Sequence, residues 1–410
     1  MLDAGIEDLR LFQFILLPGT EANDVATRTR HRYRTGFRVL ARGFGRYEVY
    51  GQPVPAAEIQ EVCLGTDTMP ADDYVACRAF DLTISIFNNA GILREFFRAA
   101  EALGVKRSIV LRRIFQNVHT TPGPIADVYQ EFHRAEARNF FDRREALEQF
   151  LAEPGTLDAY LRGEYGVNHI YRARTVALVQ LFPEVAALAR QAVQEALAEH
   201  GLEDGLLRCF FDELVQMSVA RKSDLTAIDR RVELTSHFDF PALHRVGYRV
   251  DPRRAHVPEG IRLRVAHTDS QRADLPKYFA QYGTSLDGLG QFLQRNDSHL
   301  NTLLYRHVGY VDAVVPLDLS SNLVPDAPVA APLFDSHLDR PLLGEGASPG
   351  DAAPDTAAHP LRLVKTLGPL VVGLCVGLSP APAGTGHLRT GVTGHPAAHA
   401  LVQFIRRPAA

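Results

Sequence analysis

LRLFQFILL, residues 9–17, is the stretch of sequence that most directly indicates a fold class. Only Arg10 and Gln13 interrupt its apolar character, and Pro18-Gly19-Thr20-Glu21 follows at once. A nearly continuous apolar run that ends in a turn signal is typical of a strand buried on both faces, as in a parallel sheet. Residues 1–5 resemble the last turn of a helix, so we expect one unit of a repeated strand–helix arrangement here.

The sequence beyond this unit predicts a mostly helical chain. Short β pieces are expected between residues 37 and 64, around a turn at 51–55. From Asp67 onward, apolar residues recur every three or four positions, which predicts helices. The expected helices span about 67–87, 92–103, 125–139, 143–152, 156–163, 168–181, 183–199 and 205–221. Strands at 232–238 and 261–265 and an amphipathic segment at 275–305 follow.

The composition changes after about residue 315. Of the last 80 residues, 33 are Ala, Gly or Pro and 11 are charged, so we expect a disordered tail there. The predicted architecture is therefore α/β and then mostly α. It has three parts: the end of a partial (β/α) barrel over 1–45, a helix-rich region with a small β element over 46–314, and a tail over 315–410.

Composition and charge also narrow the classes of function. The net charge of −4 offers no general attraction for nucleic acid. Runs of eighteen apolar residues are absent, and acidic residues near the N-terminus do not suit a signal peptide, so we expect a cytoplasmic protein without a membrane span. Four isolated cysteines, at positions 63, 77, 209 and 375, offer no closely spaced pair for a metal, and we expect them to be buried apolar residues.

Several stretches together resemble the cobalamin-binding radical SAM enzymes. They cover roughly residues 1–310 and resemble the part of that family after its catalytic motif. The stretches are LFQFILLPGTE (11–21), TRHRYRTGFRVLAR (29–42), FGRY (44–47), DTM (67–69), DY (73–74), IFNN (86–89) and QYGTSLDGLG (281–290).

The resemblance implies a late barrel strand that ends at Pro18, Gly19, Thr20 and Glu21. Catalytic groups of such barrels lie at the carboxyl ends of the strands. The resemblance therefore implies that these four residues contact S-adenosylmethionine or substrate. The alternative is a turn in which Thr20 or Glu21 caps the following helix.

One departure from the family is decisive for activity. The family holds a [4Fe–4S] cluster with three cysteines spaced CxxxCxxC, and no such triplet occurs here. The parent family implies S-adenosylmethionine, a [4Fe–4S] cluster and cobalamin, but we expect none of them on this chain alone. We expect a C-terminal fragment, or one subunit of a split enzyme that acts on a small molecule and pairs with a separately encoded N-terminal half.

An arginine-rich segment offers a candidate anion site. Residues 25–47 contain seven arginines and no acidic residue. Arg34, Arg38 and Arg42 are the candidates for binding a phosphate or carboxylate substrate. The segment lacks the interleaved aromatic residues of a nucleic-acid surface. A solvated face that pairs with nearby acids is the other interpretation.

Two His/Asp pairs follow the late strands. His237 and Asp239 stand near the end of one strand, and His267 and Asp269 near the end of the next. If the four side chains met, they would suit a metal hydrolase; otherwise they are strand ends and turn residues. Three functions thus remain open: a radical SAM fragment without catalytic residues of its own, a non-catalytic helical partner-binding module, and a metal hydrolase.

Overall fold

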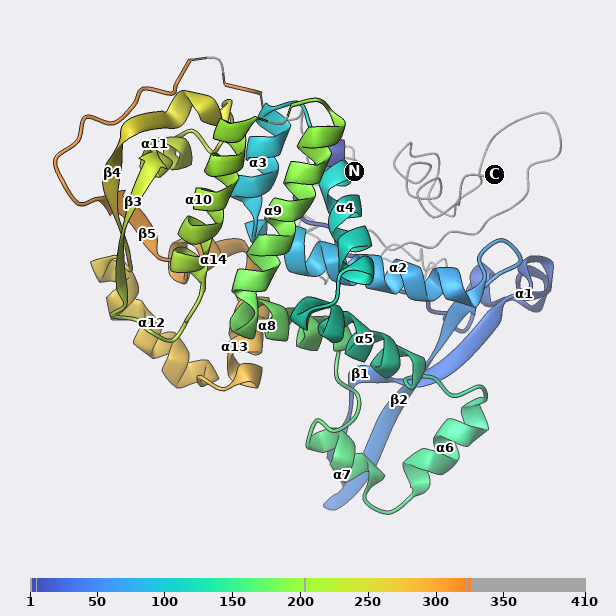
Figure 1. Cartoon of the computed structure of the whole chain (residues 1–410). Helices are drawn as coiled ribbons and strands as arrows, with labels where there is room; N and C mark the ends of the chain where they lie inside the picture. The colour runs from blue at the N-terminus through green and yellow to red at the C-terminus, as the bar shows by residue number, and fades with distance from the viewer. Residues whose placement is uncertain (1, 5, 203, 322, 326–410) are drawn as a thin grey trace, which may run out of the picture.

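The chain forms a helical core with one small antiparallel sheet on each side (Figure 1). The computed structural model describes residues 2–4, 6–202, 204–321 and 323–325. Most of the expected tail, including Cys375, lies outside the described residues. The mostly helical character predicted for the chain is confirmed.

The first sheet is a long hairpin of β1 (Arg34–Val49) and β2 (Gln52–Gly65). Tyr50 and Gly51 connect the strands, with φ values of 49° and 73°. Positive φ at both turn residues gives the turn a twist that matches the right-handed twist of the two antiparallel strands it joins. The register shifts between Val39 and Phe44, where Arg42 has a φ of 66°. Residues 37–64, expected as short β pieces, therefore form most of one continuous hairpin.

Residues 9–17 lie along β2, and the expectation of a buried strand in a parallel sheet is wrong. Ile15 pairs with Val62 in an antiparallel bridge, and Phe14 accepts a hydrogen bond from the Cys63 backbone at 2.9 Å. Phe12 and Leu17 are 47% and 56% exposed. A two-residue turn allows β1 and β2 to pair only antiparallel, and the described residues contain no parallel strands. The described residues thus show no partial barrel.

Two short helical segments connect residues 9–17 to the hairpin. They are a 3₁₀ turn, Glu21–Asn23, and α1, Val25–His31. Arg32 follows α1 in the left-handed conformation, which ends the helix and turns the chain into β1.

The helical core follows the hairpin. Its helices are α2 (Ala71–Thr83, continued by a π-helical turn at Ile84–Asn88), α3 (Arg94–Ala102), α4 (Arg107–Thr120), α5 (Pro124–Ala137), α6 (Arg144–Ala152), α7 (Thr156–Leu161), α8 (His169–Gln180), α9 (Phe182–Glu199) and α10 (Gly205–Lys222). Helix α9 runs through the centre and contacts α3, α4 and α10. Its buried face carries Ala186, Ala189, Ala192 and Ala196, which let neighbouring helices approach closely.

The second sheet closes the other side of the core. Its strands β3 (Arg231–Phe238), β4 (His256–Ala266) and β5 (His307–Tyr310) are all antiparallel. Around it lie α11 (Phe240–Arg245), α12 (Asp269–Tyr282), α13 (Leu286–Arg295) and α14 (Leu300–Leu303). Thr268 and Gln271 form a capping box that begins α12.

No single helix in the described part of the chain is long and apolar enough to cross a membrane. Helices α8 and α9 meet the length and composition criteria only together, across a bend of 94°.

Candidate functional site

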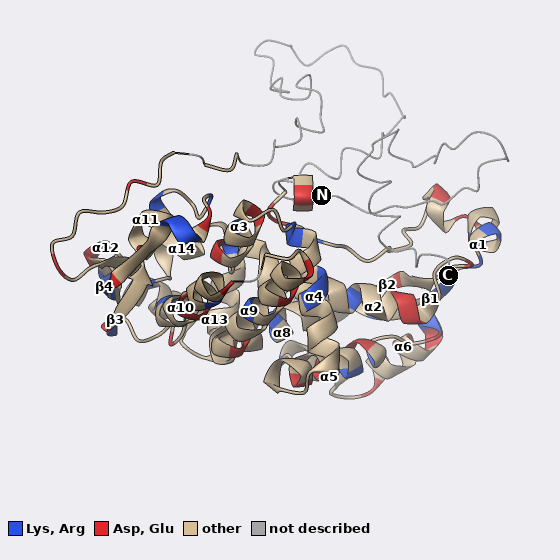
Figure 2. Ribbon diagram, turned by 45° about the horizontal axis from the view of Figure 1, so that its top comes forward, with Lys and Arg blue, Asp and Glu red and all other residues tan. Residues whose placement is uncertain are grey.

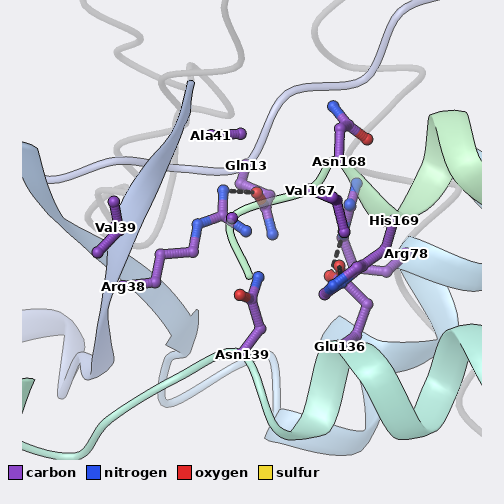
Figure 3. A pocket seen from close by; sticks show the side chains of 11 residues that line it. Gln13, Arg38, Val39, Ala41, Arg78, Glu136, Asn139, Val167, Asn168 and His169 are labelled. Atoms are coloured by element: carbon purple, nitrogen blue, oxygen red, sulfur yellow. Dashed lines mark hydrogen bonds and ion pairs between the residues drawn. The ribbon is translucent and has the colours of Figure 1, made fainter. Parts of the chain in front are cut away.

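A cavity of about 40 Å³ lies where residues 9–17 and the hairpin meet the helices (Figure 3). Its polar lining comes from five different parts of the chain: Gln13, Arg38 on β1, Arg78 on α2, Glu136 and Asn139 at the end of α5, and Asn168 and His169 at the start of α8. One water needs roughly 10–15 Å³ of such space, so the cavity holds a few waters and is too small for a substrate.

Glu136 is the centre of the charged groups around this cavity. It is buried, accepts a hydrogen bond from Arg78 Nε at 3.0 Å, and lies 2.9 Å from His169 Nδ1. Burial opposes its charge, but the His169 hydrogen bond and the charge of Arg78 outweigh burial and lower the pKa of Glu136 to about 2. Glu136 is therefore a fixed negative charge at neutral pH.

Asp81 is the group in this network that titrates near neutrality. Arg78 Nη1 donates to its carboxylate at 2.7 Å, one helical turn away on α2. Burial raises the pKa of Asp81 to about 7, and the neighbouring Glu136 adds to this, although Arg78 acts in the opposite direction. The network can thus take up and release one proton near pH 7.

Arg38 joins the hairpin to the same cavity. Its guanidinium donates to the Gln13 side chain and lies 5.3 Å from the ring centre of Phe140. Gln13 in turn donates to the Tyr74 hydroxyl. Burial lowers the pKa of Arg38 from its ordinary value. Arg38 is therefore half-buried and held by the Gln13 and Phe140 side chains.

The three arginines expected to grip one anion are not brought together. Arg34 is exposed at the start of β1, and Arg42 donates to Gln294 on α13 at 3.2 Å. Arg34, Arg38 and Arg42 are each four positions apart on an extended strand, which places neighbours roughly 13 Å apart. Acidic and basic residues are both distributed along the helices of the core (Figure 2).

Residues 18–21, expected near S-adenosylmethionine, form a surface turn. Pro18, Gly19 and Glu21 are exposed, and Thr20 Oγ1 donates to the Leu17 carbonyl at 2.8 Å. Thr20 precedes the 3₁₀ turn at Glu21–Asn23 without a side-chain capping bond. The described contacts of these residues lie within their own turn.

The two His/Asp pairs do not converge, so the interpretation as strand-end and turn residues holds for the described residues. Strands β3 and β4 are antiparallel, with Arg231 opposite Ala266 and Phe238 opposite His256. His237 therefore lies at one end of the sheet, and His267 lies at the other. The described residues contain no group of three or more His, Cys, Asp or Glu side chains arranged to hold a metal.

Each of these four residues has a different local role. His237 pairs with Glu213 at 2.9 Å, and Asp239 caps α11 and accepts from the Tyr310 hydroxyl. His267 is buried between the carbonyls of Ile228 and Leu304. Asp269 lies in the first turn of α12 and pairs with Arg272.

The cysteines within the described residues are separate. Cys63, Cys77 and Cys209 are free thiols, and burial raises the pKa of Cys63 to about 11. They do not fit an iron–sulfur cluster, which needs several thiolates around one site.

Sequence reasoning missed the residues of the cavity network other than Arg38. Arg78, Asp81, Glu136 and His169 lie on three helices, up to 91 positions apart. The spacing of Arg78 and Asp81 by three positions is a local signal for a helical ion pair. Nothing in the sequence joins that pair to Glu136 and His169.

No protein-family model matches this chain, and a search of curated proteins finds no similar sequence.

Proposed function

We propose that this chain is the helix-rich C-terminal portion of a cobalamin-binding radical SAM enzyme. The observation that carries the proposal is the contact between three of the seven stretches that resemble this family. Gln13 of the stretch at 11–21 contacts Arg38 of the stretch at 29–42 and Tyr74 of the stretch at 73–74. Asn89, in the stretch at 86–89, accepts from the backbone nitrogen of Leu9 at 3.0 Å and donates to the Leu9 carbonyl at 2.6 Å, just before the stretch at 11–21 begins.

In this proposal the chain supplies no cluster. Its four cysteines lack the CxxxCxxC spacing, so the iron–sulfur cluster belongs to another part of the enzyme. The surface turn at residues 18–21 faces solvent and is available to a second domain. S-adenosylmethionine and cobalamin would then bind between that domain and this one.

The proposal is tested by adding the missing half. The chain is treated with iron and sulfide under reducing conditions, given S-adenosylmethionine, and assayed for 5′-deoxyadenosine. We expect none from the chain alone, and production when a co-expressed upstream reading frame with CxxxCxxC is present. 5′-Deoxyadenosine from the chain alone, or no CxxxCxxC frame upstream, would contradict the proposal.

A second candidate is a non-catalytic helical module that binds a partner protein. The specific observation is the far end of the hairpin, where Tyr47, Val49, Tyr50 and Val54 are 56%, 44%, 101% and 41% exposed. Exposed apolar side chains gathered at one place mark interaction surfaces.

The same co-expression separates the two candidates. Copurification of the two halves without 5′-deoxyadenosine favours the module. In that case Tyr50→Ser, at the turn of the hairpin, should weaken copurification. Val25→Ser, at a residue that is 80% exposed on α1, is the matched control and should leave copurification unchanged.

A further inference from the structure

A larger cavity, of about 240 Å³, lies at the other end of the helical core. It is lined by the end of α10, helix α11, the start of α12 and the chain from α14 into β5. Its size is close to the lower end of small-molecule pockets, which begin at roughly 300 Å³. This cavity therefore has room for a small ligand.

The lining of this cavity is polar and basic. The described residues that line it include two arginines, two histidines and several uncharged hydrogen-bonding side chains, and no aspartate or glutamate. The lining residues are Arg221, His244, Thr268, Gln271, Asn301, Thr302, Tyr305, Arg306, His307 and Val308. A site with this lining favours a ligand that carries negative charge.

Arg221 carries a buried charge at the wall of this cavity. Only 4% of it is exposed, and its Nε donates to the Arg306 carbonyl at 3.0 Å. Its two terminal nitrogens have no hydrogen-bond or ion-pair partner among the described residues. A guanidinium presents a planar pair of donors that matches the oxygens of a carboxylate or phosphate, and a buried charge without a partner is costly.

The charges around Arg221 neutralise it only in part. Glu95 is bound by Lys222 at 2.5 Å and by Ser218 at 2.9 Å, so its single negative charge is shared between Lys222 and the nearby Arg221. The terminal nitrogens of Arg306 donate to carbonyl oxygens at the end of α10 and just beyond it, while its buried Nε has no partner. The cavity therefore has an excess of buried positive charge.

We propose that this cavity binds a small molecule with a carboxylate or phosphate group, and that Arg221 is its charge partner. Asn301 and Thr302 line the same cavity from the segment opposite α10 and supply further hydrogen-bonding groups. The site is independent of the radical SAM proposal, because it uses none of the residues that carry that resemblance.

Isothermal titration of the full chain with inorganic phosphate, and separately with succinate, tests the proposal. We expect saturable binding of one or both anions, and the tighter one identifies the class of ligand. Arg221→Met should weaken binding about 10- to 100-fold, the range expected for loss of a hydrogen bond between charged groups. Arg264→Met, on the exposed face of β4 where Arg264 pairs with Glu233, is the matched control.

A second variant keeps the test decisive if Arg221→Met does not fold. Asn301→Asp adds a carboxylate to the cavity at a half-buried position, and should abolish anion binding while the helical circular-dichroism signal is retained. Unchanged affinity in folded Asn301→Asp would overturn the proposal. Absence of binding of both anions to the natural chain, up to high millimolar concentrations, would also overturn it.

Discussion

Replacing Glu95 with Gln removes the partner of the most deeply buried lysine in the described chain. The Lys222 side chain is 0% exposed, and its Nζ contacts Glu95 Oε1 and the Ile92 carbonyl, each at 2.5 Å. Breaking a buried ion pair on one side usually costs about 3–5 kcal/mol, since the remaining charge is left without compensation. Whole domains are stable by about 5–15 kcal/mol, so the expected loss is a large share of the total.

Two features of the structure place the expected loss near the lower end of that range. The ring centres of Tyr305 and Phe182 lie 5.3 Å and 6.0 Å from Lys222 Nζ and still attract a cation. Burial lowers the pKa of Lys222 to about 8 even with Glu95 present, so the lysine can also lose its proton when Glu95 is neutralised. We therefore expect Glu95→Gln to cost about 3 kcal/mol at pH 7.

The pH dependence gives this prediction a signature of its own. In Glu95→Gln the pKa of Lys222 falls further, while the unfolded chain keeps an ordinary lysine. Between pH 7 and 9 the unfolded state then binds more protons than the folded state, so stability of the variant should rise with pH. Urea unfolding followed by circular dichroism at both pH values measures the effect.

A double variant provides the control. Glu95→Gln with Lys222→Met removes both charges and should recover most of the lost stability. A cost below about 1 kcal/mol for Glu95→Gln, or a double variant as unstable as the single one, would refute the reasoning.

Three further predictions concern the side of the molecule that carries the hairpin. Burial raises the folded-state pKa of Asp81 to about 7, so the natural chain loses stability as the pH rises from about 4 to 7, where only the unfolded state has released the proton. Relative to the natural chain, the free energy of unfolding of Asp81→Asn should therefore increase by at least about 1 kcal/mol from pH 5 to pH 8. Urea unfolding measures this, and the same difference in midpoint between the two proteins at pH 5 and at pH 8 would contradict it. Gly166 has a φ of +68°, and a Cβ there would lie 2.6 Å from a ring carbon of Phe44, so Gly166→Ala should cost at least about 2 kcal/mol. Gly163→Ala is the control, because Gly163 also has a positive φ (+79°) but an added Cβ there would meet no atom within 4 Å. Its cost should be about 1 kcal/mol. Similar thermal unfolding of the two variants would exclude the steric argument. Asn89→Ala removes both hydrogen bonds to the backbone of Leu9, so limited proteolysis should cut residues 1–20 faster than in the natural chain, and an unchanged rate would show that these bonds do not hold the segment.

Helical periodicity was the most reliable guide to this fold. Helices α2, α3 and α5 to α10 lie where the spacing of apolar residues predicts them, because each buries an apolar face. Helices α6 and α7 bury it against the hairpin, and the others bury it in the core around α9. Helix α4 was not predicted, although Val110, Ile114 and Val118 have helical spacing and are buried.

The apolar run at residues 9–17 shows what sequence pattern leaves open. An apolar run predicts extended structure, but the direction and number of its neighbours depend on distant segments. Here the neighbour is β2, about fifty residues later, and it pairs with the run on one side only among the described residues. The partner of such a strand cannot be read from the run itself.

The candidate sites were predictable only in small part. Arg38 was expected to face an anion, but it binds the Gln13 side chain instead. Arg221 lies in the last turn of an ordinary amphipathic helix, and its neighbours come from residues 244–308. What makes Arg221 notable is its burial and unmatched charge, and both arise only when these segments pack together.

Arg306 has a consequence for the order in which the protein forms during synthesis. Its guanidinium donates to the carbonyl oxygens of Ala220, Ser223, Asp224 and Ala227, where the chain leaves α10. During synthesis, about eighty more residues must be translated after α10 before Arg306 is available to donate to these carbonyl oxygens. Until then this end of α10 is exposed to water. A protease should therefore cleave near the end of α10 in ribosome-bound chains that stop before residue 306, and chains that contain Arg306 should be protected there.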